Sequence, residues 1–540
     1  MDTKPLYVAL ALGFAAWFPA ALRGGPQHPA LRPSFQTSDR CLACHNGIST
    51  PSGEDISIGF AWRSSMMGNS SRDPYWQGSV RRESIDHPES QASIEDECSV
   101  CHMPMTRFEA KLQGQKGQVF SHLPFDAGKR DNARAEDGVS CSVCHQIAKE
   151  KLGTPESYNG GFVIEPPASK SDHLEYGPFA VDAGHQRIMN TSTAGFRPIE
   201  AAHIRDSALC GTCHTLKTRA LGPGGKDIGA LPEQMPYPEW LHSDYPAKAT
   251  CQSCHMPEVA GEAPITAVLG VMRAGAHRHS FVAGNFFMLN MLNLYRADLS
   301  VKALPAEMSA AADRTVSFLQ SQSARVNIRS VDSTPGGLQV QVFVQNLTGH
   351  KLPTAYPSRR AWLHFVIHDA NGGVVFESGA LNADGSIQGN DNDADPARLE
   401  PHYREIASSD QVQIYESILK DSAEHVTTGL LSAIGYLKDN RLLPSGFRKE
   451  TAEPDIAVIG DAMEDPNFTD AGDLVRYSVK LGEARGPFHI EAELWYQPIG
   501  FRWAHNLAPY NADEPRRFVN YYDSMASSTA VLLAHAEATH

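Results

Sequence analysis

Ten cysteines constrain this chain of 540 residues more than any other feature, because all of them follow one repeated pattern. The cysteines come in pairs separated by two residues, and each pair is followed directly by a histidine. The pairs are Cys41 with Cys44, Cys98 with Cys101, Cys141 with Cys144, Cys210 with Cys213 and Cys251 with Cys254, followed by His45, His102, His145, His214 and His255. The spacing C-x-x-C-H is the signature of covalent attachment of a c-type haem.

The spacing has a physical reason. Two thiols three positions apart can each form a thioether with one vinyl group of the same haem, and the adjacent imidazole then becomes the proximal ligand of the iron. The sequence therefore predicts five c-type haems, with the ten cysteines as attachment residues and the five motif histidines as proximal ligands.

Three other uses of paired cysteines fit less well. A disulfide scaffold gives no reason for a histidine after every pair. Structural zinc needs sets of four ligands, and five separate motifs do not divide into such sets. Thioredoxin-like redox pairs occur once in a domain, whereas here five pairs lie within a segment of about 215 residues.

The N-terminus has the pattern of an export signal. Lys4 precedes an apolar run over residues 6–22 that ends among small residues, as in a secretory signal peptide. The run is short for a membrane span, which needs roughly 20 apolar residues. We expect residues 1–24 to be a signal peptide, with an uncleaved anchor as the alternative, and the protein to lie in the periplasm or on the outer cell surface.

The motif spacing predicts a haem-packed segment. Successive motifs begin 57, 43, 69 and 41 residues apart, so the core of this segment must consist largely of porphyrin. We expect short helices and irregular chain there, and haems close enough together to conduct electrons.

The sixth ligand of each iron decides between electron transfer and catalysis, because a second histidine closes the iron to small molecules. The candidate distal ligands are His122, His203, His242, His279, His350 and Met67. His279 is preferred over its neighbour His277, and His87, His173 and His185 are held in reserve. Met66 and Met67 follow the first motif where no histidine occurs, and packing against porphyrin is the favoured role for both.

Several of these segments resemble the exported multihaem cytochromes c of the cytochrome c-554-like group. The resemblance is carried by the five motifs, by His-Met-Pro after two of them, by residues 65–74, and by Arg278-His279-Ser280-Phe281, over residues 38–285. Such proteins often place a distal histidine where this chain has Met66 and Met67, so the resemblance leaves the coordination of one haem open. Pentahaem nitrite reductases are similar in haem number but use a C-x-x-C-K motif, which does not occur here.

The C-terminal half has a different pattern. Residues 285–295 and 306–320 have apolar residues at helical spacing, with Pro305 suited to a helix start. Alternating apolar residues then predict strands around 326–328, 340–344, 363–367 and 490–496, and Asn371-Gly372 predicts a hairpin turn. Residues 517–534 are predicted to form a closing helix.

One acidic segment, residues 391–395, imitates the opening of a calcium loop. It lacks the glycine and the final glutamate of that loop, so we expect a solvated acidic loop instead.

The net negative charge of the chain limits the kinds of molecule that it can bind. Lysine and arginine number 47 against 62 acidic residues, a net charge of −15, which argues against nucleic acid as a partner. Redox proteins are the expected partners, a small-molecule substrate is not expected, and association with a membrane or cell surface is left open.

The sequence thus predicts an α+β multidomain protein. A pentahaem cytochrome c domain, mostly helical or irregular, would occupy residues 25–284, followed by a helical connector at 285–324 and an antiparallel β-sandwich-like domain at 325–540. The predicted function is electron transfer through mainly bis-histidine haems, so that the chain is more an electron carrier than an enzyme. The alternative is a multihaem oxidoreductase that acts on a small nitrogen or oxygen compound at one five-coordinate haem.

Overall fold

The computed structural model describes Met1 and residues 34–126, 128–129, 132–165 and 172–540. The predicted signal peptide at residues 1–24 lies outside the described residues, apart from Met1. Residues Ser34–His540 form one compact unit, which holds every cysteine motif and the whole C-terminal half.

Short helices carry the cysteine motifs. The motifs begin in, or lie within, α1 (Asp39–Leu42), α4 (Gln91–His102), α7 (Cys141–Cys144), α9 (Ser207–Gly211) and α11 (Cys251–His255). Residues three positions apart lie on the same face of a helix. Each helical turn therefore directs its two thiols toward the same side.

The first and fourth motifs extend past the ends of their helices. Cys44 lies two residues beyond the end of α1, and Cys213 lies two residues beyond the end of α9. In both motifs the turn continues through the second cysteine, because the N–H of the motif histidine donates to the carbonyl of the first cysteine, at 3.0 Å in the first motif and 2.9 Å in the fourth. The thiols of these two motifs therefore keep the helical spacing.

The remaining elements of this segment are also short. Its other helices are α2 (Ile58–Arg63), α3 (Pro74–Asp86), α5 (Pro104–Leu112), α6 (Asn132–Glu136), α8 (Ala183–Ser192) and α10 (Pro236–Leu241). Its strands form three two-stranded sheets: β1 (His173–Gly177) with β2 (Phe196–Glu200), β3 (Leu216–Gly222) with β4 (Lys226–Gln234), and β5 (Glu262–Ala263) with β6 (Arg273–Ala274). The short helices were predicted, whereas the three two-stranded sheets of this segment were not.

Two helices follow where the apolar spacing predicted them. They are α12 (Phe286–Leu294) and α13 (Pro305–Gln322), and Pro305 occupies the first turn of α13 as expected. The side chain of Glu307 accepts a hydrogen bond from the Leu304 backbone N–H at 3.0 Å, which satisfies one of the free N–H groups at the start of the helix.

The four predicted strands are confirmed as β7 (Ala324–Thr334), β8 (Gly337–Asn346), β9 (Arg360–His368) and β17 (His489–Gln497). Asn371-Gly372 lies in the turn between β9 and the antiparallel strand β10 (Val374–Ser378). Gly372 has a φ of 81°, a conformation that favours glycine.

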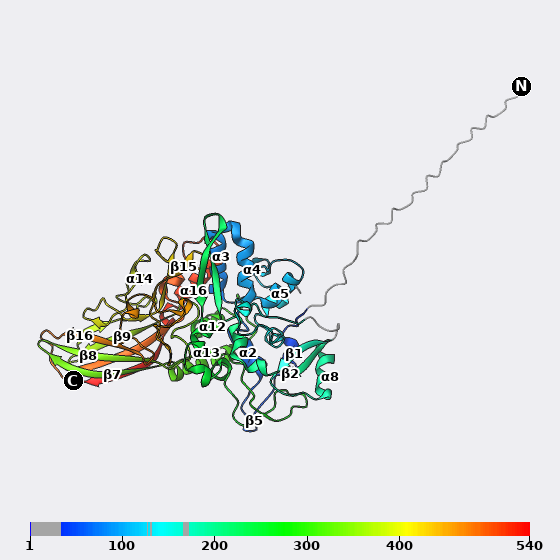
Figure 1. Ribbon diagram of the computed structural model, residues 1–540, viewed down its shortest axis with the longest axis horizontal. Helices are drawn as coiled ribbons and strands as arrows, with labels where there is room; N and C mark the ends of the chain where they lie inside the picture. Colours follow the sequence, from blue (N-terminus) through cyan, green and yellow to red (C-terminus); the bar gives the residue numbers. More distant parts are fainter. Residues whose placement is uncertain (2–33, 127, 130–131, 166–171) are drawn as a thin grey trace. The chain divides into compact units, whose positions relative to one another are not determined.

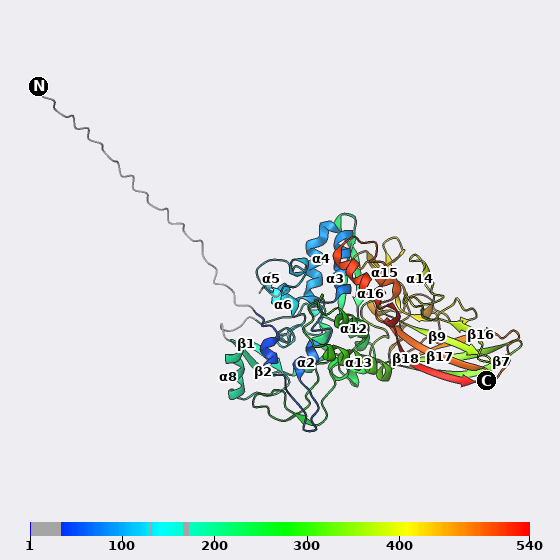
Figure 2. The ribbon, with the colours of Figure 1, turned by 180° about the vertical axis from the view of Figure 1, so that it is seen from behind.

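Two sheets contribute to one apolar core. One has the order β10-β9-β17-β18, in which β18 is Val531–Thr539, and β12 (Ile414–Tyr415) also pairs with β9. The other has the order β11-β16-β8-β7, in which β11 is Glu405–Ile406 and β16 is Asp473–Lys480. Figure 1 shows the neighbouring strands β16, β8 and β7 of the second sheet, and Figure 2 shows β17 and β18 of the first sheet from behind. Between the sheets, Phe365 of β9 stacks on Tyr477 of β16 with ring centres 3.8 Å apart.

The predicted closing helix at residues 517–534 is only partly correct. The helix α16 spans Asp513–Ser524, and the chain then forms the strand β18 (Val531–Thr539), which pairs with β17. The alternation in Ala534-His535-Ala536-Glu537-Ala538 has the period of a strand, and pairing with β17 covers an edge that would otherwise have unpaired backbone groups.

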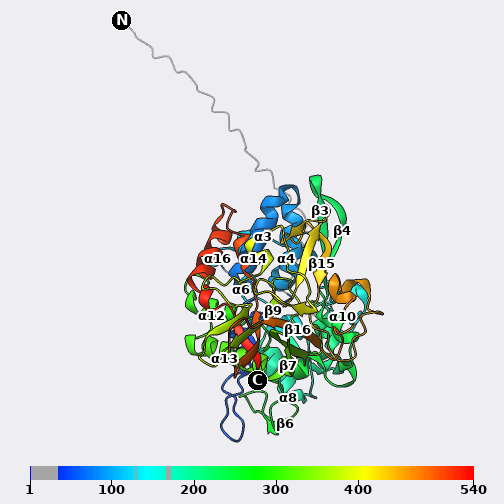
Figure 3. The same cartoon turned by 90° about the vertical axis from the view of Figure 1, so that its left-hand side faces the viewer.

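Elements of the motif-bearing segment pack directly on the C-terminal half. The β3–β4 hairpin lies beside β15 (Ala433–Asp439) (Figure 3). The hydroxyl of Tyr436 in β15 donates to the carbonyl of Pro232 in β4 at 2.6 Å. α3 packs on α16, and Arg81 pairs with Glu514 at 2.9 Å. The described chain is therefore an α+β fold, as predicted, and its largest apolar cluster joins the sheets with Tyr75 of α3 and Leu231 of β4, while smaller clusters lie mainly in the motif-bearing segment.

Among the helices of the described residues, none has both the length and the apolar character that a membrane span requires.

Candidate metal centres

In four of the five motif histidines, the ring nitrogen Nδ1 is hydrogen-bonded to a backbone carbonyl. The Nδ1 atoms of His45, His102, His145 and His255 lie 2.6–2.7 Å from the backbone carbonyls of Ile265, Ser70, Tyr176 and Val282, respectively. A carbonyl oxygen can only accept, so Nδ1 carries the proton and Nε2 keeps its lone pair. Metal-ligating histidines usually have this arrangement, in which a backbone carbonyl fixes the tautomer and orientation of the ring.

The first motif is held at two consecutive residues by one distant segment. The carbonyl of Cys44 accepts from the backbone N–H of Ala267 at 2.8 Å and from the hydroxyl of Thr266 at 3.1 Å. Ile265, the preceding residue, supplies the carbonyl that holds the ring of His45. The segment at residues 265–267 therefore fixes both the second cysteine and the histidine of this motif, although it lies more than 200 residues away in the sequence.

His279 faces the motif histidine His145. Their ring centres are 6.3 Å apart, and their planes are inclined by 21°. The Nδ1 of His279 lies 3.1 Å from the carbonyl of His277, so its Nε2 is the nitrogen without that bond. Burial, with a contribution from nearby His145, lowers the pKa of His279 to about 3, so the ring is neutral. The neighbouring His277 points elsewhere and bonds the carbonyl of Met256 at 2.5 Å.

His350 stands in the same relation to His255, although about a hundred residues separate them in the sequence. The ring centres are 6.2 Å apart and the planes are inclined by only 8°. The Nδ1 of His350 lies 2.9 Å from the carbonyl of Lys351. Burial lowers the pKa of His350 to about 4, with smaller contributions from the charges of His255, Arg359 and Arg441.

These two ring pairs fit an iron held between two imidazoles. At metal–nitrogen distances of about 2 Å, a metal between two opposed imidazoles separates their ring centres by roughly 6 Å. The donor set is also suitable, since neutral imidazoles bind haem iron and both rings of each pair have Nδ1 engaged. The residues present therefore fit a bis-histidine iron at two positions.

The thiols of different motifs lie close together. Thiols of different motifs shift the pKa of one another, Cys41 with Cys141, Cys101 with Cys213, and Cys210 with Cys251, and the pKa of Cys210 and of Cys213 is also raised by nearby Cys144. All ten cysteines are described, and none forms a disulfide. The third motif is thus adjacent to the first and the fourth, and the fourth is also adjacent to the second and the fifth.

The other candidate distal ligands have different surroundings. His122 bonds Asn132 through Nδ1 at 3.1 Å, His203 bonds the carbonyl of Ile147 through Nε2 at 2.8 Å, and His242 bonds the carbonyl of Arg448 through Nε2 at 3.1 Å. Met67 is half-buried, and its backbone carbonyl accepts from the N–H of Val139. Their assignment as ligands stays a prediction.

Trp76 is a residue of this region that the sequence did not indicate. It stacks on the ring of His102 with centres 4.3 Å apart and planes inclined by 3°. It is directed there by α3, whose N-terminus is capped by Asp73, which accepts from the N–H groups of Tyr75 and Trp76. A tryptophan in a short helix has no local signal that separates this role from ordinary core packing.

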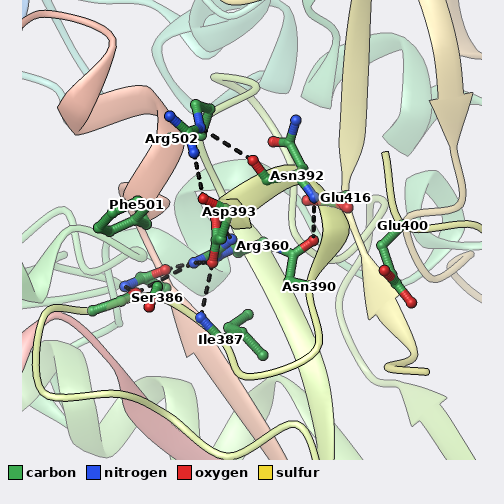
Figure 4. Close-up of polar contacts among 12 residues, drawn as sticks. Arg360, Ser386, Ile387, Asn390, Asn392, Asp393, Glu400, Glu416, Phe501 and Arg502 are labelled. Carbon is green, nitrogen blue, oxygen red and sulfur yellow. Dashed lines mark hydrogen bonds and ion pairs between the residues drawn. The ribbon is translucent and has the colours of Figure 1, made fainter. Parts of the chain in front are cut away.

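The acidic segment at residues 391–395 is not a solvated loop, which corrects the expectation from sequence. It forms the short helix α14 (Asp391–Ala394), and Asp393 is buried in a bidentate ion pair with Arg360 at 2.8 and 2.9 Å (Figure 4). Asp393 also accepts from the N–H of Ile387, and Asn390 caps the helix. Asp393, the middle residue of the acidic segment, therefore stabilises the buried core through its ion pair with Arg360 and is not available as a calcium ligand.

A buried cluster of His402, Asp465 and Asp473 has the residue types of a metal site but a hydrogen-bond pattern of another kind. The Nδ1 of His402 accepts from the amide groups of Gln413 at 2.8 Å and Asn440 at 3.1 Å. Nε2 must then carry the proton and donate to Asp465 at 3.2 Å. With both ring nitrogens engaged, His402 has no lone pair to offer a metal.

Comparison with known proteins gives one structural match. No family model matches the chain, and no curated protein matches it. The chain is similar in structure to the penta-heme cytochrome c552 from Thermochromatium tepidum, with a TM-score of 0.51 and 15% sequence identity. The match covers 94% of this chain and 99% of that one. The chain therefore has a fold similar to that of a multihaem cytochrome c.

Proposed function

We propose that this chain is an exported electron-transfer protein that binds five c-type haems, mainly through two axial histidines each. The observation that carries the proposal is a pair of nearly parallel imidazoles with ring centres about 6 Å apart, found twice, at His145/His279 and His255/His350. In both pairs the motif histidine follows a Cys-x-x-Cys spacing, and its partner comes from outside any motif.

The chain's own residues would bind, orient and shield the cofactor, which would supply one-electron redox chemistry when bound. The cysteines would hold each haem by thioethers, and the backbone carbonyls that fix Nδ1 would hold Nε2 toward the iron. The second histidine would leave no coordination position for a small molecule, so two of the haems would serve only to pass electrons.

The proximity of the thiols supports transfer between the haems. Groups attached at the first, third and fourth motifs would be successive neighbours, and those at the second and fifth motifs would both adjoin the fourth. We infer a branched path with the fourth motif at its junction.

The location and organisation belong to the same proposal. Residues 1–24 would direct export to the periplasm or outer cell surface, and residues 25–284 would hold the haems. Residues 285–324 would form a helical connector between this domain and the β-sandwich-like domain at residues 325–540. Redox proteins would be the partners, and the resemblance to the cytochrome c-554-like group supports that interpretation.

A haem count and a spin-state spectrum test the proposal on the purified protein. The pyridine haemochrome assay should give five haems per chain, and electron paramagnetic resonance should show at least four low-spin ferric haems. A large high-spin signal with rapid binding of cyanide or carbon monoxide would instead support an oxidoreductase with a five-coordinate haem. A count of zero would contradict both.

A further inference from the structure

The loop that carries His350 is tied to the motif-bearing segment by its next residue. The backbone N–H of Lys351 donates to Glu239 Oε2 at 3.1 Å. Glu239 belongs to α10, which lies between the fourth and fifth motifs. The carbonyl of His350 accepts from Asn346 Nδ2 at 2.8 Å, so the backbone on both sides of the ring is held.

The side chains around this loop form a closed network of four charges. Lys351 Nζ lies 2.8 Å from Asp439, Arg441 lies 2.7 Å from the same carboxylate, and Arg441 also lies 3.0 Å from Glu239. The side chains of Lys351 and Glu239 are 0% exposed, and those of Asp439 and Arg441 are 2% and 7% exposed. Two cations and two anions thus cancel in a region that water does not reach.

Such a network is costly to build and is not needed for stability alone. A buried ion pair often contributes little compared with apolar residues of similar size, whereas removal of one partner leaves an uncompensated charge. The network lies beside a candidate iron ligand, and the ring of His350 is affected by the charge of Arg359, which lies outside the network, and less strongly by that of Arg441, which belongs to it. A role in holding or tuning His350 would explain why the charged network lies at this place in the core.

We propose that Glu239, Lys351, Asp439 and Arg441 position His350 as the distal ligand of the haem attached at the fifth motif, and that their balanced charges set the reduction potential of that haem. The inference rests on the proposed function, since it requires a haem at Cys251 and Cys254. Reduction adds one electron, so an uncompensated positive charge nearby raises the potential and an uncompensated negative charge lowers it.

Two substitutions with opposite charge consequences provide the test. Asp439→Asn leaves one excess positive charge, and Lys351→Met leaves one excess negative charge. In spectroelectrochemical titrations of the full-length holoprotein, we expect one haem to shift to higher potential in the first variant and to lower potential in the second. The haem concerned is identified as the one that becomes high-spin in His350→Ala.

A matched pair elsewhere controls for burial. Arg360 and Asp393 are both 4% exposed and form a similarly buried ion pair (Figure 4). The hydrogen bonds of Arg360 go to Asp393, Gln497 and Gly385, which lie outside the His350 loop. Arg360→Met and Asp393→Asn should leave the potential of the fifth-motif haem unchanged. Equal shifts in the two test variants, or none, in a folded protein with five haems would overturn the proposal.

A charge-balanced variant covers the case in which a single substitution prevents folding. Lys351→Met combined with Asp439→Leu removes one charge of each sign, so the protein should fold with a potential close to that of the unmodified chain. A potential displaced as far as in a single variant would contradict the electrostatic role. A haem count below five in the unmodified protein would instead count against the proposed function, so the two failures are distinguishable.

Discussion

At the residue scale, the position of a ring beside a motif histidine distinguishes two of the distal candidates. The ring centres of His279 and His145 are 6.3 Å apart, and those of His350 and His255 are 6.2 Å apart. The ring nitrogen in use does not make this distinction, because His277 also engages a carbonyl through Nδ1. Sequence could list these histidines but could not distinguish them, because the orientation of each ring depends on how the chain folds around it.

Substitution of His279 tests the first ligand pair. In His279→Ala we expect one haem to change from low-spin to high-spin, because the iron bound to His145 would lose its second imidazole. Resonance Raman spectroscopy on the holoprotein reports the change. His277→Ala, two residues away, should leave all spin states unaltered, and a spectrum that changes only in the His277 variant would show that the wrong histidine was chosen.

The N-cap of α3 makes a prediction about pH. Burial raises the pKa of Asp73 from 3.8 to about 6, although two backbone N–H groups oppose the shift. The folded state then binds more protons than the unfolded state between these pH values, so the free energy of unfolding falls as pH rises from about 4 to about 6.

Asp73→Asn should remove this dependence. Asparagine retains the cap, and the variant should be more stable at pH 7 by about 1–3 kcal/mol, from roughly 1.4 kcal/mol for each pKa unit. Guanidinium unfolding at pH 4.5 and pH 7 measures the difference. Asp182→Asn, at the exposed cap of α8, should not give this gain, and an equal gain there would count against burial as the cause.

At the element scale, strands with alternating apolar and polar residues could be predicted from the sequence. Strands whose conformation depends on pairing with another strand could not. The strands β8 and β17 bury one face along their length and β7 does so over its first residues, which is the arrangement that alternating apolar residues indicate, whereas β9 is buried on both faces. Only the first four residues of β18, Val531-Leu532-Leu533-Ala534, were included in the predicted closing helix, and their pairing with β17 decides their conformation. Tertiary pairing therefore overrode the local pattern.

The contact between the two sheets can be tested at Phe365. Phe365 is fully buried, and Phe365→Ala should lower the free energy of unfolding by about 3–5 kcal/mol through the lost contacts and the cavity left behind. Val374→Ala on the exposed strand β10 should change it by less than about 0.5 kcal/mol, since Val374 is 58% exposed. Equal effects in thermal or chemical unfolding would mean that the sheets do not share this core.

At the scale of the whole molecule, the cysteine motifs could be predicted from the sequence, but the contacts between the motifs and distant residues could not. Each haem motif is complete within five residues, so sequence alone identifies it. The pairing of His350 with His255 and the contact of Glu239 with Lys351 join residues about a hundred positions apart. Only the packing of the C-terminal half on the motif-bearing segment brings them together.

The branched path makes a prediction for electron transfer across the molecule. Loss of the haem at the fourth motif, in Cys210→Ala/Cys213→Ala, should slow the redistribution of electrons among the remaining haems after rapid photoreduction. Loss of the haem at the fifth motif, in Cys251→Ala/Cys254→Ala, should not, because that haem would lie at an end of the path. Equal rates in both variants would contradict the junction at the fourth motif.

The mass of the purified mature chain tests the central claim most directly. Covalent attachment predicts an intact mass equal to that of the mature polypeptide plus five haems, and the added mass should persist under denaturing conditions because thioethers do not dissociate. A mass equal to that of the bare polypeptide would contradict the account.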